Sequence, residues 1–357
     1  MRSVSLFLGS LAVLANAQSA CGAPVTETTT STAAAPAETP VSTTCTNPPK
    51  RQEWRQLSTT QKKEYIDAVL CLTTKPAISG IDGTVNRFDD HQAVHSEQTP
   101  DIHWVGHFII WHRYFVATYE KALRNDCGYT SAQPYWDWSL DAEPSNPNST
   151  APFETDIFDP TTGFGGNGPK EEPTADQNPL NITGGTGGGC VQDGPFAAPA
   201  FYVNVPEKDC LRRDFIPWIM NGFADPALVA KVLEQPDYTS FARELEGTPS
   251  FDAKNIHGSG HFGIGGVLGQ IGNAANSPAD PLFYLHHGNL DHIFWTWQQK
   301  DLAARLDQVG GPVVPFDYSG QNVTLDFQIN MGALSGNATL KDLLNTAGDI
   351  LCYTYDS

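Results

Sequence analysis

The ten histidines of this chain fall into two dense groups, which constrain its fold more than any other feature. One group spans 22 residues and the other 36, and residues 113–256 contain no histidine. The members are His91, His95, His103, His107 and His112 in the first group, and His257, His261, His286, His287 and His292 in the second. A single histidine is usually a surface or hydrogen-bonded side chain, but neutral imidazole is also the commonest metal ligand. Two such dense groups favour a fold that gathers imidazoles around metal.

The spacing in the second group indicates a helix. His257 and His261 are four residues apart, so a helix would place both imidazoles on one face. Gly258 and Gly260 would each destabilise that helix by about 1 kcal/mol relative to Ala. In a helix, these small residues would let a substrate ring or another backbone approach a metal. If this stretch is a loop, the two glycines do not indicate a metal site.

Two further spacings bear on the ligands. His103 and His112 are nine residues apart, and they share a face only if the chain bends or a helix begins near residue 106. Asp291 follows His287 by four residues, so we expect its carboxylate to hold that imidazole in one tautomer. Carboxylates are otherwise scarce, which argues against a two-histidine, one-carboxylate iron site. Two sets of three histidines predict two metal ions, whereas structural zinc would need closed tetrahedral sites.

Periodic apolar residues predict a mainly helical fold with long loops and a few short strands. Ser58 and Gln61 form a capping-box pattern at the start of a helix. Further helices are expected over 106–125, over 213–234, and from Asp280-Pro281 to about residue 305. Residues 144–200 are rich in Gly, Pro, Asn and Asp and predict a long surface loop.

The N-terminal segment is predicted to lie outside the folded domain. Residues 1–17 combine Arg2, an apolar run too short to span a membrane, and a small-residue cleavage pattern, which is typical of a secretory signal peptide. Residues 18–44 are rich in Thr, Ser, Ala and Pro, which predicts disorder. We therefore expect a secreted, extracellular protein with one domain over residues 45–357.

Cysteines and sequons agree with secretion. Seven cysteines predict disulfides with one thiol left over, for which Cys21 is the candidate, although the spacing does not give the pairing. Candidate N-glycosylation sites are Asn148, Asn181, Asn322 and Asn337.

The charge balance excludes two classes of partner. The chain carries 21 Lys and Arg against 40 Asp and Glu, a net charge of −19. Such a surface repels phosphate backbones and anionic lipids, so neither nucleic acid nor a membrane surface is expected as a partner. The oligomeric state does not follow from the sequence.

Two long segments around the histidines resemble known signatures. They read His103-Trp-Val-Gly-His-Phe-Ile-Ile-Trp-His112-Arg113-Tyr-Phe-Val-Ala-Thr-Tyr-Glu120 and Asp280-Pro-Leu-Phe-Tyr-Leu-His286-His287-Gly-Asn-Leu-Asp291. These segments are similar to the first and second copper signatures of the tyrosinase and catechol oxidase family, in the family's order. Pro134-Tyr-Trp-Asp-Trp138 and Tyr353-Thr-Tyr355 resemble two shorter family motifs, so the likeness covers residues from about 50 to 355.

The resemblance implies a central four-helix bundle that carries a dinuclear copper site. His95, His103 and His112 would bind one copper ion, and His257, His261 and His287 would bind the other. His95 is preferred because His91 stands where the family usually has an aromatic residue. His286 directly precedes a ligand and should point about 100° away around the helix. It is expected to be a non-ligand, as are His91, His107 and His292.

Two departures from the family pattern stand out. Many members cross-link the second ligand to a cysteine two residues earlier, but that position is Asp101 here. The thioether should therefore be absent, leaving His103 freer to move. The sequence also stops two residues after Tyr355, so the chain resembles a short fungal-type member without the C-terminal lid domain of longer relatives.

The resemblance implies an oxidase that uses O2 and two copper ions to convert o-diphenols to o-quinones and, as a further class of substrate, to oxidise o-aminophenols. Members that hydroxylate monophenols often carry an Asn directly after the first ligand of the second copper, where it holds a water with a nearby Glu. Here that position is Gly258, and Glu246 is a candidate carboxylate whose alternative is a solvent-exposed side chain. We expect weak monophenol hydroxylation. The alternatives are strong monophenolase activity and a haemocyanin-like O2 carrier.

Overall fold

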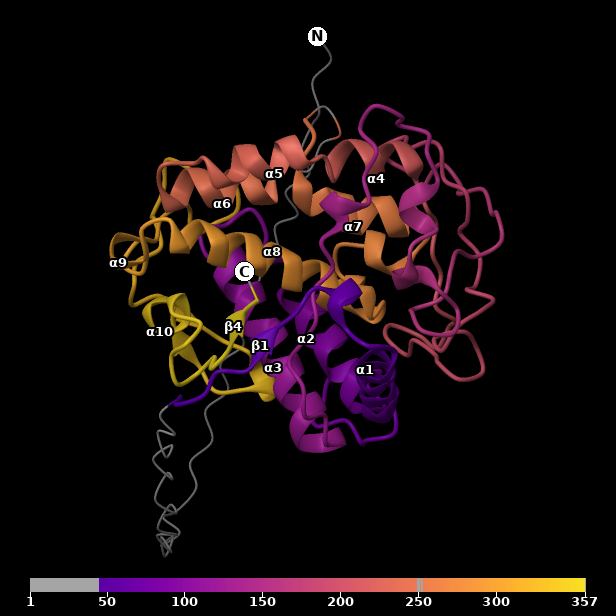
Figure 1. Ribbon diagram of the computed structural model, residues 1–357, viewed down its shortest axis with the longest axis horizontal. Coiled ribbons are helices and arrows are strands. Elements are labelled where there is room, and N and C mark those ends of the chain that lie inside the picture. Colours follow the sequence, from indigo (N-terminus) through magenta and orange to yellow (C-terminus); the bar gives the residue numbers. More distant parts are fainter. Residues whose placement is uncertain (1–44, 249–250, 252, 357) are drawn as a thin grey trace, which may run out of the picture. The chain divides into compact units, whose positions relative to one another are not determined.

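Helices are the main regular secondary structure of this protein. The computed structural model describes residues 45–248, 251 and 253–356 (Figure 1). Within these residues the α-helices are α1 (Thr59–Leu72), α2 (Arg87–Ile102), α3 (Phe108–Cys127), α4 (Pro217–Phe223), α5 (Pro226–Leu233), α6 (Tyr238–Glu246), α7 (Ile256–Gly265), α8 (Leu282–Gln299), α9 (Leu302–Arg305) and α10 (Leu340–Leu344). The strands are β1 (Lys50–Arg51), β2 (Gln328–Ile329), β3 (Ala338–Thr339) and β4 (Thr354–Tyr355), with β1 parallel to β4 and β2 antiparallel to β3. The predicted mainly helical fold with a few short strands is confirmed.

Local sequence signals place several helix ends. The capping box of α1 is confirmed, because the Ser58 side chain accepts from the N–H of Gln61 while the Gln61 side chain accepts from the N–H of Ser58. Helix α3 begins at Phe108, two residues after the expected boundary. The Asp280-Pro281 signal precedes α8, which ends at Gln299 rather than near 305; the short helix α9 follows separately.

The single helix predicted over residues 213–234 is wrong. The structure has two helices there, because Asp225 caps α5 and Pro226 lacks the N–H needed to continue α4. Helix α2 was not predicted at all. It is buried along most of its first half, so its polar and apolar residues do not separate into the two faces that reveal an amphipathic helix.

Four helices, α2, α3, α7 and α8, position the two histidine groups. Helix α3 packs against α2 and α8, and α8 packs against α7. In Figure 1, α8 crosses the middle of the domain, and 14 of its 18 residues are buried. A helix buried on nearly all sides lies at the centre of a core. This arrangement agrees with the expected central bundle.

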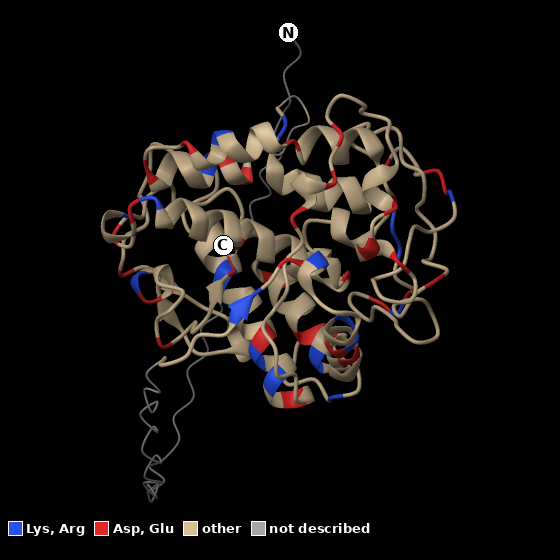
Figure 2. Ribbon diagram, in the orientation of Figure 1, with Lys and Arg blue, Asp and Glu red and all other residues tan. Residues whose placement is uncertain are grey.

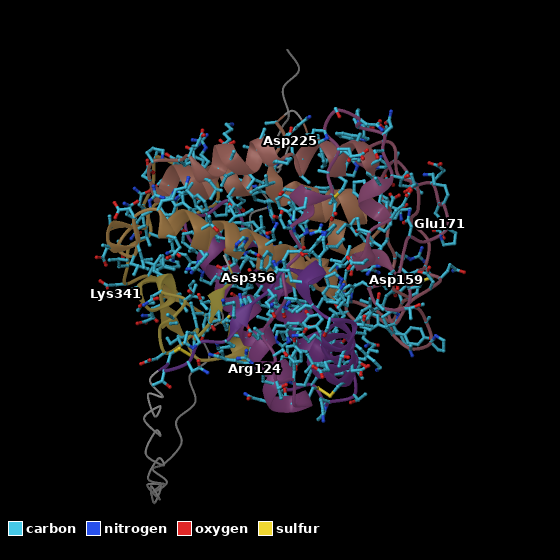
Figure 3. All side chains as sticks on the ribbon, in the orientation of Figure 1. Arg124, Asp159, Glu171, Asp225, Lys341 and Asp356 are labelled. Atoms are coloured by element: carbon cyan, nitrogen blue, oxygen red, sulfur yellow. A yellow bond between two sulfur atoms is a disulfide. The ribbon has the colours of Figure 1, made fainter. Side chains whose placement is uncertain are left out.

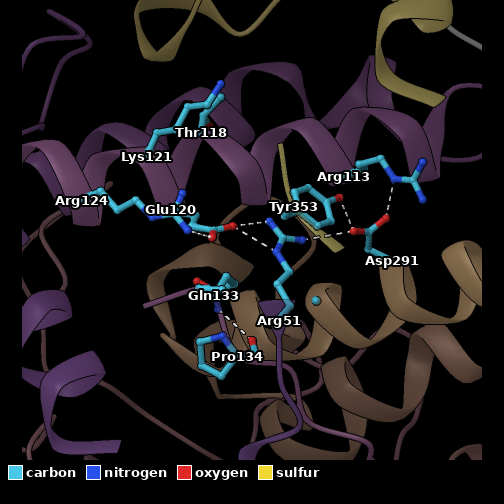
Figure 4. A network of polar contacts seen from close by, with 12 residues as sticks. Arg51, Arg113, Thr118, Glu120, Lys121, Arg124, Gln133, Pro134, Asp291 and Tyr353 are labelled. Atoms are coloured by element: carbon cyan, nitrogen blue, oxygen red, sulfur yellow. Dashed lines mark hydrogen bonds and ion pairs between the residues drawn. The ribbon is translucent and has the colours of Figure 1, made fainter. Parts of the chain in front are cut away.

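A buried ionic network joins the β1–β4 pair to this bundle. Arg51 of β1 donates to Glu120 of α3 at 2.6 Å and to Asp291 of α8 at 3.1 Å (Figure 4). The Arg51 guanidinium also lies 3.4 Å from the centre of the Tyr353 ring. Arg113 donates to Asp291 at 2.5 Å. Because these charges are buried together, removing one would leave its partners uncompensated, which typically costs about 3–5 kcal/mol.

Three disulfides also link segments of the chain, and Figure 3 draws disulfide bonds in yellow. They are Cys45–Cys352, Cys71–Cys127 and Cys190–Cys210. Every cysteine in the described part of the chain is therefore paired, and Cys21, the predicted odd one, lies outside the described residues. Cys45–Cys352 bridges residues 307 positions apart, next to the β1–β4 pair.

Two predicted segments cannot be compared with the structure. The signal peptide over residues 1–17 and the disordered segment over 18–44 lie outside the described residues. Among the helices that the structure does describe, none has the length and apolar character needed to cross a bilayer.

Candidate metal centre

The first set of predicted ligands meets where α2 and α3 come together. His95 lies on α2, His103 is the residue that ends it, and His112 lies one turn into α3. Their ring centres are 5.2–5.6 Å apart, and their nitrogens are close enough to hold one ion. The chain bends between residues 103 and 107, which is the condition under which His103 and His112 share a site.

The second set meets between α7 and α8. His257 and His261 lie on α7, as the four-residue spacing predicts, and His287 lies on α8. Their ring centres are 4.6–5.5 Å apart. Helix α7 carries no charged residue (Figure 2). The sequence of α8 contains one, Asp291. Imidazoles are therefore the polar groups that these two helices bring to the site.

The two sets face each other. The rings of His112 and His287 stack at 4.5 Å between centres, and those of His103 and His257 are nearly parallel at 6.4 Å. Phe108 and Phe283 pack against members of both sets. Two ions held here would lie side by side, enclosed by aromatic rings.

Hydrogen bonds orient the imidazoles for metal binding. The Nδ1 atoms of His95, His103, His112 and His261 lie 2.7–3.1 Å from the backbone carbonyls of Ala275, Thr99, Phe108 and Ile271 respectively. A carbonyl can only accept, so each Nδ1 carries the proton and each Nε2 keeps its lone pair. The Nε2 atoms of His95, His112 and His257 are buried without a hydrogen-bond partner. The donor set therefore fits two ions that prefer imidazole, such as copper.

Burial also keeps these imidazoles neutral. The pKa values of His103 and His261 fall to about 4, because burial disfavours the charged ring. The pKa values of His95, His112, His257 and His287 lie well below the usual range, through burial first and neighbouring histidines second. A neutral ring is the form that binds metal.

His286 lies inside the second cluster, so the expectation that it points away is wrong. Its ring centre is 4.9 Å from that of His261, and its ring nitrogen groups with those of the second set. Its Nδ1 accepts a hydrogen bond from the Trp138 indole at 3.1 Å. The neutral ring must then carry its proton on Nε2, which has no lone pair left for metal, so the proposed ligand set remains His257, His261 and His287. Gly260 makes room for this ring, because a Cβ there would lie 2.2 Å from the His286 Nδ1.

The other three histidines lie outside both clusters. His91 is buried against Tyr119 and Phe115, with its Nδ1 on the Arg87 carbonyl. His107 packs against Phe327, and His292 stacks on Tyr135. The preference for His95 over His91 therefore agrees with the geometry.

Asp291 does not contact His287, so its predicted role in fixing that imidazole is wrong. Its two oxygens accept from Arg113, Arg51, Tyr353 and Tyr355 at 2.5–3.1 Å, and these partners hold its pKa below the usual range despite burial. The Nδ1 of His287 has no hydrogen-bond partner. Asp291 instead anchors α8 to β1 and β4.

A pocket of about 380 Å³ opens onto both sets. His103 of the first set and His257 and His261 of the second form part of its lining. Its walls are largely apolar and include Leu180, Ile182, Phe223, Phe251, Phe262 and Val267. No Lys or Arg of the described chain lines it. An uncharged aromatic molecule of more than one ring would fit its size and polarity.

Glu246 lies in this pocket wall, so its interpretation as a solvent-exposed side chain is wrong. It is 6% exposed and accepts from the backbone N–H of Trp104 at 2.5 Å. Burial raises the pKa of this carboxyl well above its usual value, although cations bound at the histidines would lower it again. Gly258 and Asn255 share the wall, and Asn255 accepts from the N–H of Gly258 at 2.7 Å. Asn255 was not predicted, although an Asn just before a helical His-x3-His is a recognisable N-cap signal.

Comparisons with known proteins agree with the geometry. Residues 85–300 match the family model described as the common central domain of tyrosinase. The chain is 35% identical to the tyrosinase-like protein phomQ1 of Diaporthe leptostromiformis, over 88% of this chain and 81% of that protein. It is 32% identical to Tyrosinase P of Aspergillus terreus, over 87% and 93% of the two chains. A polyphenol oxidase structure from Thermothelomyces thermophila matches with a TM-score of 0.72 and 31% identity, over 86% and 88%.

Proposed function

Because the chain belongs to the tyrosinase family, we propose that it is a catechol oxidase that converts o-diphenols to o-quinones. Two diphenols are consumed for each O2, giving two quinones and two waters. His95, His103 and His112 would hold one copper ion, and His257, His261 and His287 the other. When bound, these ions supply the redox chemistry, since they accept electrons from the diphenol and deliver them to O2.

The observation that carries this proposal is the apolar pocket that reaches both histidine sets. A phenol ring in the pocket would lie beside His103, His257 and His261, which belong to both histidine sets. The carbonyl-bound Nδ1 atoms hold the imidazoles in place, and Phe108 and Phe283 exclude water around them. An oxygen carrier has no need of a cavity for a phenol, so the pocket favours an enzyme over a haemocyanin-like carrier.

Gly258 supports a preference for diphenols. A monophenol must lose its less acidic proton before it can be hydroxylated, which calls for a positioned acceptor. Gly258 has no side chain that could hold a water beside Glu246, and the Asn255 amide next to it already accepts the Gly258 N–H. We therefore propose that monophenol hydroxylation is weak.

Oxygen uptake by the copper-loaded protein tests the proposal. A panel of a monophenol, an o-diphenol and an o-aminophenol, with the metal-free protein as control, should show fast uptake with the diphenol at one O2 per two diphenols. Reversible O2 binding without diphenol turnover would establish a carrier instead. Equal kcat/KM for the monophenol and the diphenol would establish a full tyrosinase.

We also propose that the protein is secreted. Disulfides persist in oxidising compartments, and six cysteines of the chain are paired. The sequon residues Asn148, Asn181, Asn322 and Asn337 are all exposed. Mass spectrometry of protein from the medium of a fungal expression host should find a new N-terminus near residue 18 and N-linked glycans. Protein that stays in the cells with Met1 intact would contradict the proposal.

A further inference from the structure

We propose that an aromatic shelf beside the pocket mouth binds a second ring of the substrate, so that the preferred substrates are phenols carrying a further aromatic group. The shelf consists of Trp104, Phe316 and Tyr318. This inference rests on the proposed function, since it names the class of phenol that the same site accepts.

The shelf begins at the pocket wall and continues outward. Trp104, the residue after the ligand His103, lines the pocket, and the Phe316 ring stacks on its indole at 5.0 Å between centres. Phe316 and Tyr318 are each 48% exposed, although large aromatic residues are normally buried. A small second cavity lies between Trp104 and Tyr318 and shares Glu246 with the main pocket. The aromatic rings of the shelf therefore continue from the pocket wall to the exposed surface, where the Arg243 guanidinium lies 4.6 Å from the centre of the Tyr318 ring.

The backbone holds the shelf in an unfavourable conformation. Trp104 and Phe316 have φ values of 55° and 63°, in the left-handed region that non-glycine residues avoid. The Phe316 N–H donates to the Trp104 carbonyl at 3.2 Å, and the Gly106 N–H donates to the Pro312 carbonyl at 2.7 Å. Gly106 allows this contact, because a Cβ there would lie 2.3 Å from the Gly310 carbonyl oxygen. Strained residues that are fixed in this way concentrate at binding sites, where they pre-organise a surface.

The size and charge of the pocket indicate which substrates would use the shelf. A volume of about 380 Å³ falls in the range of pockets that bind drug-sized molecules, and one phenol ring would leave much of it empty. Leu180, 53% exposed, lines the pocket as a further apolar residue at its surface. Because no Lys or Arg of the described residues lines this pocket, a carboxylate on the substrate would find no partner there. A neutral second ring that extends from the phenol to Phe316 satisfies both conditions.

Two diphenols of different length test the proposal in the copper-loaded enzyme: 4-methylcatechol and 4-(2-phenylethyl)catechol. We expect Phe316→Ala to lower kcat/KM for the long substrate by about two- to tenfold, the range of one aromatic stacking contact. The same variant should leave 4-methylcatechol within twofold of the wild type. Phe316→Tyr, which keeps the ring, should restore the long substrate. Leu140→Ala, at an exposed leucine outside the pocket lining, should change neither substrate.

Binding without turnover separates this inference from the proposed function. Resorcinols have 1,3-hydroxyls and cannot be dehydrogenated directly to an o-quinone. Calorimetry of the copper-loaded protein without O2, with resorcinol and 4-(2-phenylethyl)resorcinol, therefore measures Kd alone. We expect Phe316→Ala to raise Kd for the long resorcinol only. Equal losses for short and long ligands, or no loss for the long one, would overturn the shelf. A wild-type protein that binds the long resorcinol more tightly but oxidises no catechol would overturn the proposed function and leave the shelf standing.

Discussion

Gly258 is the residue at which a single substitution should alter the reaction. In Gly258→Asn the new amide would reach the pocket near Glu246 and could hold a water that accepts the phenolic proton. Positioned proton acceptors typically contribute 10²–10⁴-fold, so we expect the ratio of monophenol to diphenol kcat/KM to rise at least about tenfold. Steady-state kinetics with one monophenol and its matching o-diphenol measures this ratio.

The controls for this substitution follow from the local packing. A Cβ at position 258 would lie 3.1 Å from the Asn255 side-chain oxygen and 3.3 Å from the Phe223 ring, so both must shift slightly. Gly258→Ala introduces the same crowding without the amide and should leave the ratio unchanged. Adding Glu246→Gln to Gly258→Asn should abolish the gain. If Gly258→Ala raises the ratio equally, the proton-transfer explanation fails.

His91 should make the metal-free protein sensitive to acid. Burial lowers its pKa to about 4, whereas an unfolded chain has a histidine pKa of about 6.5. Between these values the unfolded state binds the extra proton, so this residue lowers stability as the pH falls below about 6.5 and has no such effect above it. At about 1.4 kcal/mol per pKa unit, the loss by pH 4.5 is on the order of 2 kcal/mol.

His91→Phe removes this titration and keeps an aromatic ring between Tyr119 and Phe115. The free energy of unfolding is measured by urea titration of the metal-free proteins at pH 7.5 and at pH 4.5. Both proteins should lose stability at the lower pH, and we expect the loss in the variant to be about 2 kcal/mol smaller than the loss in the wild type. Parallel losses in the two proteins would show that His91 is not buried as a neutral ring.

At the scale of elements, α7 and α8 together build the second metal site. His287→Ala should lower copper from two ions per chain toward one, because the second set then offers two imidazoles and the first set is untouched. His261→Ala should have the same effect from α7. His292→Ala is the matched control on α8, since His292 stacks on Tyr135 outside the cluster, and it should retain both ions. Copper per chain is measured by elemental analysis of the purified protein, and a wild type with one ion would refute the assignment.

At the scale of the whole molecule, we expect the residues before Cys45 to be unnecessary for folding and activity. A protein that begins at Cys45 keeps the Cys45–Cys352 bridge, and we expect its Tm and catechol oxidation to match those of the longer chain. Cys45→Ser in the same protein opens that bridge and should cost about 2–5 kcal/mol of stability. A protein starting at Cys45 that fails to fold would show that residues 18–44 contribute to the domain.

Several features of this protein follow from the sequence alone, because they depend on residues close together in the chain. The capping box of α1, the pairing of His257 with His261 on one helix face, and the start of α8 all depend on positions within one or two helical turns. The helical period fixes how such neighbours lie relative to each other, whatever the rest of the chain does. The grouping of the ten histidines along the chain also predicts two metal sites.

The tertiary structure decided which side chains meet across the domain. Asp291 is four residues from His287, yet its carboxylate pairs with Arg51, 240 positions away, and does not contact the His287 imidazole. His286 turns into the second cluster because Gly260 and Trp138, on other segments, make room for it and bind it. Glu246 is buried because its carboxyl accepts from Trp104, 142 positions away. The spacing of residues along one helix determines the direction in which each side chain points. Which residue that side chain then contacts depends on how helices from distant parts of the chain pack together.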